Sequence, residues 1–347
     1  MNHRPWSGLS LLCFVFLVVS CGRDSEPTGP GQPEHTASLK LSANSWTTRA
    51  PMPTPRTHLA AGVATLSGQQ LLYAIGGFDP SAGSVSAVEA YNYVTNSWST
   101  RAPLPVALTH TNGVGNIDGR LYLSGGLLDA PTGGGLQRSL YVYNPYRNTW
   151  AKKANMPKRT GSGVTGVIGG KLYVLVGTCA DCAVSTPRRL FRYDPATDSW
   201  TGALPVSPNA HVSGAGGVIN GKFYVAGGRG RDGRDSNKLD MYDPATNSWT
   251  TLAPMPTARS GVAGAVVGGK LYVIGQANVE PGELQNQVEA YDPVRNRWIT
   301  KASLPGVGRG DLAAGRIVVD GRGIILAVGG TDVEGSGAGD VNQAYTP

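Results

Sequence analysis

The sequence has few charged residues and no long runs of basic residues. Beyond residue 21 it also lacks long apolar stretches. Only 15% of the 347 residues are charged, and lysine and arginine never stand more than two in a row. Beyond residue 21 no apolar stretch reaches the roughly 18 residues that a membrane helix needs. The formal net charge is +7, but the basic residues are dispersed, and no RNA-binding or helix-turn-helix pattern occurs. These absences argue against a membrane-spanning or nucleic-acid-binding protein.

Glycine and proline, by contrast, are plentiful, with 49 and 24 residues. Abundant turn formers and few charges, in a chain that is 40% hydrophobic, predict an all-β fold of many short strands. The chain carries no G-x-S-x-G, H-E-x-x-H or phosphate-binding-loop pattern. No familiar catalytic motif therefore identifies an enzyme.

Residues 1–20 have the plan of a secretory signal peptide. Arg4 precedes an apolar run, Leu9 to Val19, that is broken by a single serine. The run leads into "VVSC", which ends at Cys21 and resembles the bacterial lipobox, with a valine where leucine is more usual. In a lipobox the cysteine is acylated and becomes the new N-terminus. An ordinary signal peptide that is cut nearby is the alternative.

The resemblance to a lipobox implies an exported protein that is held at a bacterial cell envelope by lipid on Cys21. Two acyl chains on one residue keep a protein at a membrane surface for long periods. Residues 21–43 are polar and rich in Pro, Gly and Ser, as is typical of a disordered tether. Gly22 follows the cysteine, so an aspartate-type inner-membrane retention signal is absent. Whether the membrane is the outer or the plasma membrane stays open.

A single C-x-x-C pair, Cys179 and Cys182, lies beyond Cys21. Such a pair is either a redox motif or half of a zinc site. No second cysteine pair completes a four-ligand zinc site, and the motif follows a predicted strand, whereas thiols with a lowered pKa often lie where a helix begins. For an exported protein we therefore predict a structural disulfide that closes a loop.

One phrase recurs along the chain with a period near 50 residues. "YDPATDSW", "YDPATNSW" and "YDPVRNRW" begin at residues 193, 242 and 291, and six tryptophans recur at spacings of 52, 52, 50, 49 and 49. A repeat of this length indicates stacked supersecondary units. Each copy can be divided into four strands, with a tight turn such as "NG" at 220–221 between the first two.

These features resemble the Kelch repeat, in which Gly-Gly ends the second strand and a tyrosine and then a tryptophan follow. The resemblance covers residues 45–347 and implies an all-β, six-bladed β-propeller with four strands in each blade. The last repeat lacks its tryptophan strand, whereas a tryptophan strand at about 44–50 has no repeat before it. We therefore predict that this N-terminal strand completes the last blade of a propeller domain, residues 44–347.

The variable loops and the starts of the first strands should share one face of such a propeller. One register of these strand starts carries arginine in four blades: Arg56, Arg159, Arg259 and Arg309. Two residues further on, polar candidates recur: His58, His110, His211 and Asp311. We predict that these eight side chains converge near one mouth of the channel and bind a ligand there.

Three interpretations of these residues remain open. Kelch repeats often carry an arginine at this position that bonds loop carbonyls, which would make it structural. Arginines would equally grip carboxylates or phosphates. His58, His110 and Asp311 come from neighbouring blades and have the composition of a metal site, although the ring geometry would tend to hold them apart.

The leading hypothesis is a lipid-anchored, monomeric binding protein that presents one propeller face to a protein or carbohydrate ligand, which the arginines would allow to be anionic. The alternative is an envelope enzyme acting on an acidic sugar, since a bacterial sialic-acid mutarotase is also an exported six-bladed Kelch protein. Copper radical oxidases, which are Kelch enzymes too, need a lone crosslinking cysteine that this chain lacks. We assign no catalytic residue, and we expect no cofactor, no metal and no nucleic-acid partner.

Overall fold

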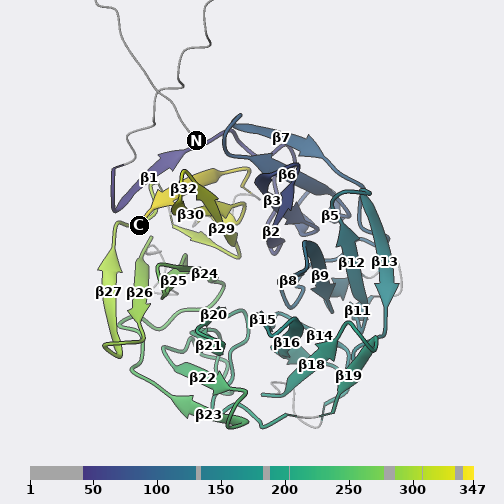
Figure 1. Ribbon diagram of the computed structural model, residues 1–347, viewed down its shortest axis with the longest axis vertical. Coiled ribbons are helices and arrows are strands. Elements are labelled where there is room, and N and C mark those ends of the chain that lie inside the picture. The colour runs from purple at the N-terminus through teal and green to yellow at the C-terminus, as the bar shows by residue number, and fades with distance from the viewer. Residues whose placement is uncertain are drawn as a thin grey trace, which may run out of the picture. The chain divides into compact units, whose positions relative to one another are not determined.

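The computed structural model describes residues 42–129, 134–182, 188–202, 204–276, 286–306, 308–332 and 339–347. Six four-stranded antiparallel sheets stand as blades around a common axis (Figure 1), and residues of their inner strands line a central channel. The prediction of an all-β, six-bladed propeller is confirmed. The predicted signal peptide and Cys21 lie outside the described residues. Within the described part of the chain, no helix combines the length and apolar character of a bilayer span.

In each blade the first strand is innermost and the last is outermost. Blade one contains β2 (Ala60–Leu66), β3 (Gln69–Ile75), β6 (Val88–Asn92) and β7 (Ser97–Thr100). Blade two contains β8 (Val114–Ile117), β9 (Arg120–Ser124), β12 (Leu140–Asn144) and β13 (Thr149–Lys153). Blade three contains β15 (Val164–Ile168), β16 (Lys171–Leu175), β18 (Leu190–Asp194) and β19 (Ser199–Thr201).

The other three blades repeat this order. Blade four contains β20 (Ala215–Ile219), β21 (Lys222–Ala226), β22 (Leu239–Asp243) and β23 (Ser248–Thr251). Blade five contains β24 (Ala263–Val267), β25 (Lys270–Ile274), β26 (Val288–Asp292) and β27 (Arg297–Lys301). Blade six contains β29 (Ala313–Val319), β30 (Arg322–Val328), β32 (Asn342–Thr346) and β1 (Ser45–Thr48).

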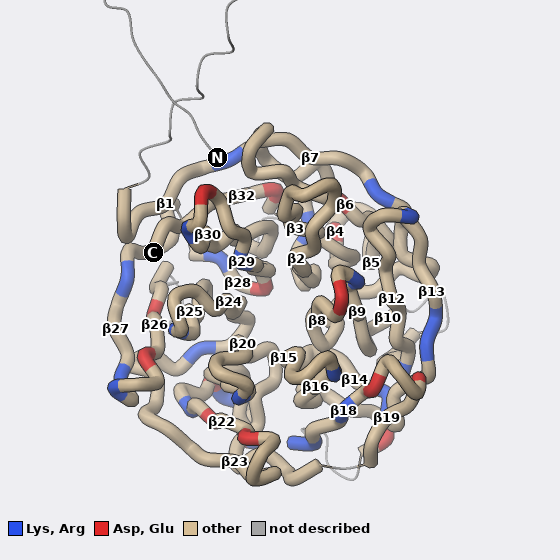
Figure 2. Tube along the Cα trace, viewed as in Figure 1, with Lys and Arg blue, Asp and Glu red and all other residues tan. Residues whose placement is uncertain are grey.

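Short two-stranded ribbons lie in the loops of four blades. They pair β4 (Phe78–Asp79) with β5 (Gly83–Ser84), β10 (Leu127–Leu128) with β11 (Gly135–Leu136), β14 (Thr160–Gly161) with β17 (Thr178–Cys179), and β28 (Arg309–Gly310) with β31 (Thr331–Asp332). Charged residues of both signs are spread around the whole ring rather than gathered on one side (Figure 2).

The inner strands are built from small residues because six of them crowd around the channel. A Cβ atom added to Gly115 in β8 would lie 2.3 Å from the Cδ1 atom of Leu172 in the next blade. The second strands are almost wholly buried, as in β21. The turn between β20 and β21 has positive φ angles of 49° at Asn220 and 73° at Gly221, the conformation that a two-residue hairpin turn of this type requires.

The last blade is closed by the N-terminal strand. β1 pairs with β32 in antiparallel register, with Trp46 opposite Tyr345. The indole N–H of Trp46 also donates to the carbonyl oxygen of Ala302 in blade five at 2.8 Å. This confirms the prediction that the N-terminal strand completes the last blade, and it ties both ends of the propeller domain into one sheet.

The recurring tyrosine–tryptophan phrase joins each blade to the one before it. In blade four the Tyr242 hydroxyl donates to Asn247 Oδ1 at 2.6 Å, and Asn247 adopts a φ of 50°. The Trp249 indole N–H donates to the carbonyl oxygen of Pro205, on the segment that enters the blade, at 2.8 Å. Equivalent tyrosine and tryptophan bonds occur in the other five blades. The phrase is therefore part of the scaffold.

Candidate functional site

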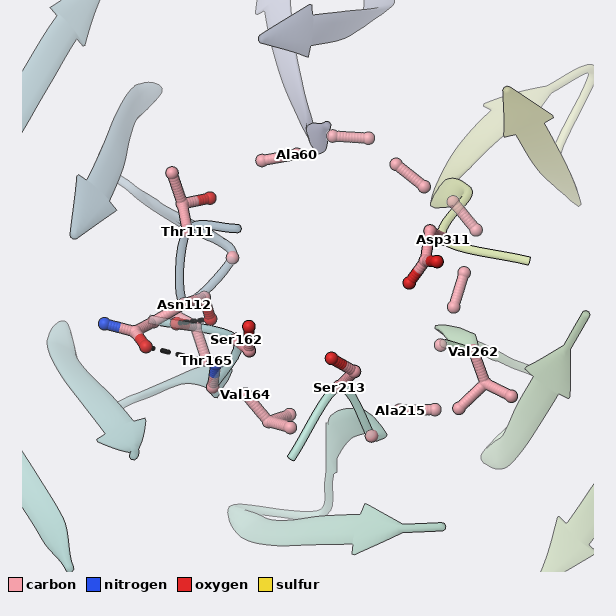
Figure 3. Close-up of a pocket in the computed structure, with 18 of the residues that line it drawn as sticks. Ala60, Thr111, Asn112, Ser162, Val164, Thr165, Ser213, Ala215, Val262 and Asp311 are labelled. Carbon is pink, nitrogen blue, oxygen red and sulfur yellow. Dashed lines mark hydrogen bonds between the residues drawn. The ribbon is translucent and has the colours of Figure 1, made fainter. Parts of the chain in front are cut away.

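Six residues, one from each blade, surround one mouth of the central channel. We call them the mouth ring: His58, His110, Ser162, Ser213, Gly261 and Asp311. All six have a positive φ between 51° and 63°. With the residues that follow them they line a cavity of about 220 Å³, around which Figure 3 shows Thr111, Ser162, Ser213 and Asp311.

Backbone hydrogen bonds run around the mouth ring from blade to blade. At 2.7 to 3.2 Å, amide groups donate to the carbonyl of the preceding ring residue: His58 to Asp311, His110 to His58, Ser162 to His110, Ser213 to Ser162, and Asp311 to Gly261. Blade five differs by one residue, because Val262 donates to Ser213 at 3.3 Å. These bonds involve only backbone atoms, so the ring leaves its side chains free to differ.

Blades six, one and two give the mouth ring its titratable groups. The Nε2 atom of His58 lies 3.1 Å from Oδ2 of Asp311, and each of these side chains is 25% exposed. The imidazole of His110 stacks on that of His58 with 3.8 Å between the ring centroids. The hydroxyls of Thr57 and Thr109 lie 3.2 and 3.0 Å from the Nδ1 atoms of His58 and His110. We call Asp311, His58 and His110 the mouth cluster.

Packing within the mouth cluster shifts the pKa values of two of its residues. Burial and the neighbouring His58 lower the pKa of His110 to about 4, so this imidazole is neutral at pH 7. Burial acts to raise the pKa of Asp311, but the hydrogen bond and charge of His58 outweigh it, so the pKa lies below its usual value. At neutral pH the mouth therefore holds a carboxylate beside a neutral imidazole.

Blades three, four and five leave their side of the mouth open. Their ring residues are small: Ser162, Ser213 and Gly261. The blade-four loop "RGRDGRDS" starts beside Ser213, because the amide of Arg229 donates to the carbonyl of Val212 at 2.8 Å. The loop exposes three arginines: Arg229, Arg231 and Arg234. Arg229 also helps to lower the pKa of Asp311.

Three of the four predicted arginines do not reach the mouth. They lie two residues before a ring residue and are at most 4% exposed: Arg56, Arg259 and Arg309. The guanidinium of Arg259 donates to the carbonyl of Gly275 at 2.9 Å and to a carboxylate oxygen of Glu289 at 2.7 Å. This corrects the expectation that the arginines line the channel. The structural interpretation holds for them, because folding turns them into the blades.

The same buried position has a different occupant in each of the other blades. We call it the buried slot, and its six residues are Arg56, Leu108, Thr160, His211, Arg259 and Arg309. His211 therefore belongs to the slot and not to the mouth. Its Nδ1 atom lies 2.7 Å from the carbonyl oxygen of Gly227, and Nε2 lies 3.1 Å from Oδ2 of Asp240. Arg56 likewise pairs with Glu89 at 3.1 Å, and Arg309 donates to Gln343 at 2.7 Å.

Arg159 lies outside both sets. It precedes the slot residue Thr160, is exposed, and binds Asp181 through Nε at 2.7 Å and Nη2 at 2.6 Å. In blade four the register read from the sequence placed His211 at the mouth, where the structure has Ser213. In five blades the ring residue stands two residues before the first residue of the inner strand, so a count backward from that strand would have found it.

The geometry of the mouth cluster is that of a hydrogen-bonded pair with a stacked ring. No group of three or more His, Cys, Asp or Glu side chains among the described residues is arranged to hold a metal ion. In the blade-three loop, Cys179 and Cys182 form a disulfide.

The comparison with protein families decides the assignment of the chain. The model of the KLHDC2/KLHL20/DRC7 Kelch-repeats domain matches residues 164–344. This chain belongs to the Kelch-repeat family. Two further Kelch motif models match residues 60–105 and 110–157.

Similar proteins share the Kelch repeats over part of their length. Kelch-like protein terF of Aspergillus terreus is 31% identical over 179 residues, which is 48% of this chain and 38% of that protein. Human Kelch-like protein 34 is 29% identical over 254 residues, 67% of this chain and 38% of that protein. The chain thus spans 38% of the length of these two relatives. The solved structure of YjhT superposes with a TM-score of 0.68 at 19% identity, covering 84% of this chain and 95% of that one, which shows a shared fold.

Proposed function

We propose that this Kelch propeller is a binding module that receives a carbohydrate unit at the mouth ring. The observation that supports this best is the mouth cluster, in which a carboxylate and two imidazoles meet, partly exposed, at a cavity. Convergent polar groups in a concave site are a usual mark of ligand binding.

The size of the cavity limits what enters it. Its volume of about 220 Å³ is below the roughly 300–1,000 Å³ of pockets for drug-sized ligands. It therefore suits a single sugar unit or a single protein side chain. Hydroxyl groups of Thr111, Ser162 and Ser213 face a carboxylate across the mouth (Figure 3). This mixture of donors and acceptors suits a ligand that is itself rich in hydroxyls.

A protein ligand fits the mouth less well. Among the described residues, three of the four large exposed hydrophobic side chains, Val94, Tyr146 and Val294, lie on turns of the opposite face. None of the four lines the mouth, whereas exposed apolar or aromatic anchors stand at the centre of most protein interfaces. An anionic group on the sugar would find its cations on the loop that carries Arg229, Arg231 and Arg234, because Arg56, Arg259 and Arg309 are buried.

The test is a glycan array with the purified full chain, followed by calorimetry on the sugars that bind. His58→Asn and Asp311→Asn are the informative variants, because asparagine tolerates the positive φ of the mouth ring. We expect either change to weaken binding at least about tenfold, since each leaves a polar partner unpaired. Arg297→Gln, on the opposite face, should leave affinity unchanged. Unaltered binding in both ring variants would refute the site.

A second candidate function is an enzyme acting on an acidic sugar, and the state of His110 favours it. At pH 7 the imidazole of His110 is neutral and can accept a proton as a weak base, beside the His58–Asp311 pair. Mutarotation needs only a base that takes the proton of the anomeric hydroxyl and an acid that protonates the ring oxygen. Acceleration of sialic-acid mutarotation that His110→Asn abolishes would support this function; a rate equal to that in buffer would remove it.

We also propose that the module is monomeric and is anchored at a bacterial envelope through lipid on Cys21. The support is the lipobox-like "VVSC" ahead of a polar tether. Cys21→Ser should move the protein from the membrane to the soluble fraction. If fractionation stays the same, the anchor is refuted. Light scattering of the delipidated protein tests whether it is monomeric.

A further inference from the structure

A second hollow lies beside blade two, where the chain passes into blade three. We call it the rim hollow. It has a volume of about 340 Å³ and shares no lining residue with the channel mouth. Its lining includes three cations and a tyrosine: Arg138, Lys152, Arg159 and Tyr141. None of the ion pairs among the described residues includes Arg138 or Lys152.

One carboxylate of the chain already binds a cation that lines this hollow. Oδ1 of Asp181 accepts from Nε of Arg159 at 2.7 Å and lies 2.6 Å from Nη2, and Oδ2 accepts from the Arg159 backbone amide at 3.2 Å. The bond to Arg159 lowers the pKa of Asp181, and the charge of Arg138 adds to that effect. The Asp181 carboxylate thus stands within electrostatic reach of two of the three cations.

A short loop holds Asp181 in that place. The Cys179–Cys182 disulfide closes the loop, and β17 pairs it with β14. The Lys158 ammonium donates to the carbonyl oxygen of Asp181 at 2.9 Å, and the Ala180 amide donates to that of Arg159 at 3.1 Å. Asp181 is therefore presented to Arg159 much as a ligand's carboxylate would be.

We propose that the rim hollow binds a carboxylate-rich segment of a protein partner, and that Asp181 occupies one carboxylate position until the partner displaces it. The planar guanidinium of arginine can bind a carboxylate through two nitrogen atoms, as Arg159 does with Asp181. Arginine and tyrosine are the residues that most often anchor protein interfaces, which favours a peptide over a saccharide. The unpaired Arg138 and Lys152 supply the remaining charge. This site is independent of the function proposed for the channel mouth.

The experiment measures binding of a fluorescein-labelled hexaglutamate peptide to the full chain by anisotropy at low salt. The double variant Arg138→Gln/Lys152→Gln should weaken binding at least about tenfold, because two charge-assisted contacts are lost. Asp181→Ala should tighten binding by up to about fivefold, the upper value for removing an exposed competing ion pair. Cys179→Ser/Cys182→Ser, which releases the loop, should change affinity in the same direction as Asp181→Ala.

Two matched controls make each result decisive. Asp243→Ala removes a carboxylate from a similar ion pair, with Lys222 at 2.8 Å, on the opposite face. Arg120→Gln/Arg322→Gln removes two exposed cations beside turns of that face. If Asp181→Ala and Asp243→Ala act alike, Asp181 is no internal competitor. If the two cation pairs act alike, the rim hollow is not a binding site. If the acidic saccharide trigalacturonate binds there and hexaglutamate does not, the proposal of a protein partner is refuted.

Discussion

The mouth ring and the buried slot lie two residues apart in the same six strand starts, yet they have opposite roles. Every slot side chain is at most 4% exposed. Slot residues differ in polarity, but each has surroundings that match it: Arg259 has Glu289, whereas Leu108 lies in an apolar cluster from blades one and two. Ring residues keep one backbone conformation and differ in chemistry. The recurrence of a charged residue in a repeat therefore need not mark a binding site, and the site that we propose lies at the positions where the residue type does not recur.

The backbone of the buried slot is held in place because it forms hydrogen bonds to the neighbouring blade. The carbonyl oxygen of Leu108 accepts from the amide of Gly77 in blade one at 2.9 Å. A Cβ atom added to Gly76, whose φ is +60°, would lie 2.4 Å from that same oxygen. The Gly-Gly pair that ends a second strand thus allows the slot of the next blade to approach.

Removing a slot arginine should have the largest effect on stability. Arg259→Ala leaves the Glu289 carboxylate buried without its partner, which costs about 3–5 kcal/mol of unfolding free energy. Urea unfolding followed by tryptophan fluorescence measures this. Arg297→Ala, an exposed arginine of the same blade, should change stability by no more than about 0.5 kcal/mol. If the two changes lower the unfolding free energy equally, a slot arginine stabilises the fold no more than an exposed one.

Acidification should act through the mouth cluster instead. The pKa of His110 is about 4 in the folded protein and about 6.5 when it is unfolded, so only the unfolded chain takes up its proton between these values. Stability should therefore fall as pH drops from about 6.5 to about 4, by at most about 3 kcal/mol and by less after solvent screening. Asp311, whose folded pKa is lowered, loses its contribution at still lower pH.

The variant His110→Asn isolates this effect. It removes the titrating group while keeping a residue that tolerates positive φ. Unfolding measured at pH 7 and pH 4.5 should show a smaller difference for the variant than for the parent chain. An unchanged pH dependence would show that His110 is not the group responsible.

A smaller effect on stability is expected from placing a carboxylate beside Arg309. In this slot the guanidinium donates to the amide of Gln343, and burial lowers its pKa to about 10. Gln343→Glu should raise the unfolding free energy by about 1 kcal/mol, the gain from a charge-assisted bond. The loss of the 3.3 Å bond from Gln343 to Pro305 offsets part of it. A fall in melting temperature would show that the slot does not favour an ion pair.

The smallest effect on stability is expected from a polar substitution at the open side of the mouth. Ser162→Asn should leave stability within about 0.5 kcal/mol of the parent value, because asparagine accepts a φ of 51°. Ser162→Val should cost about 1–2 kcal/mol, since a branched side chain clashes in that conformation. Thermal unfolding of the pair separates backbone strain from side-chain contact. Equal melting temperatures would mean that the ring conformation is not strained.

Much of the fold follows from residues that recur along the chain. The tyrosine and tryptophan of each repeat predict the outer two strands, and the turn pairs such as Asn220-Gly221 predict the inner hairpins. A lone tryptophan strand around Trp46 predicts the closure of blade six, which β1 makes with β32. These features were predictable because each depends on local backbone chemistry or on the count of strands.

The sequence by itself determined the six-bladed ring and the set of residues at its strand starts. Only the tertiary structure decided which of them face the channel. A positive φ at each ring residue turns the chain, so that the residue two positions earlier enters the blade; the recurrence of the arginines cannot show this. Likewise, His58 and Asp311 are far apart in sequence, and they meet only because the ring closes between blades six and one.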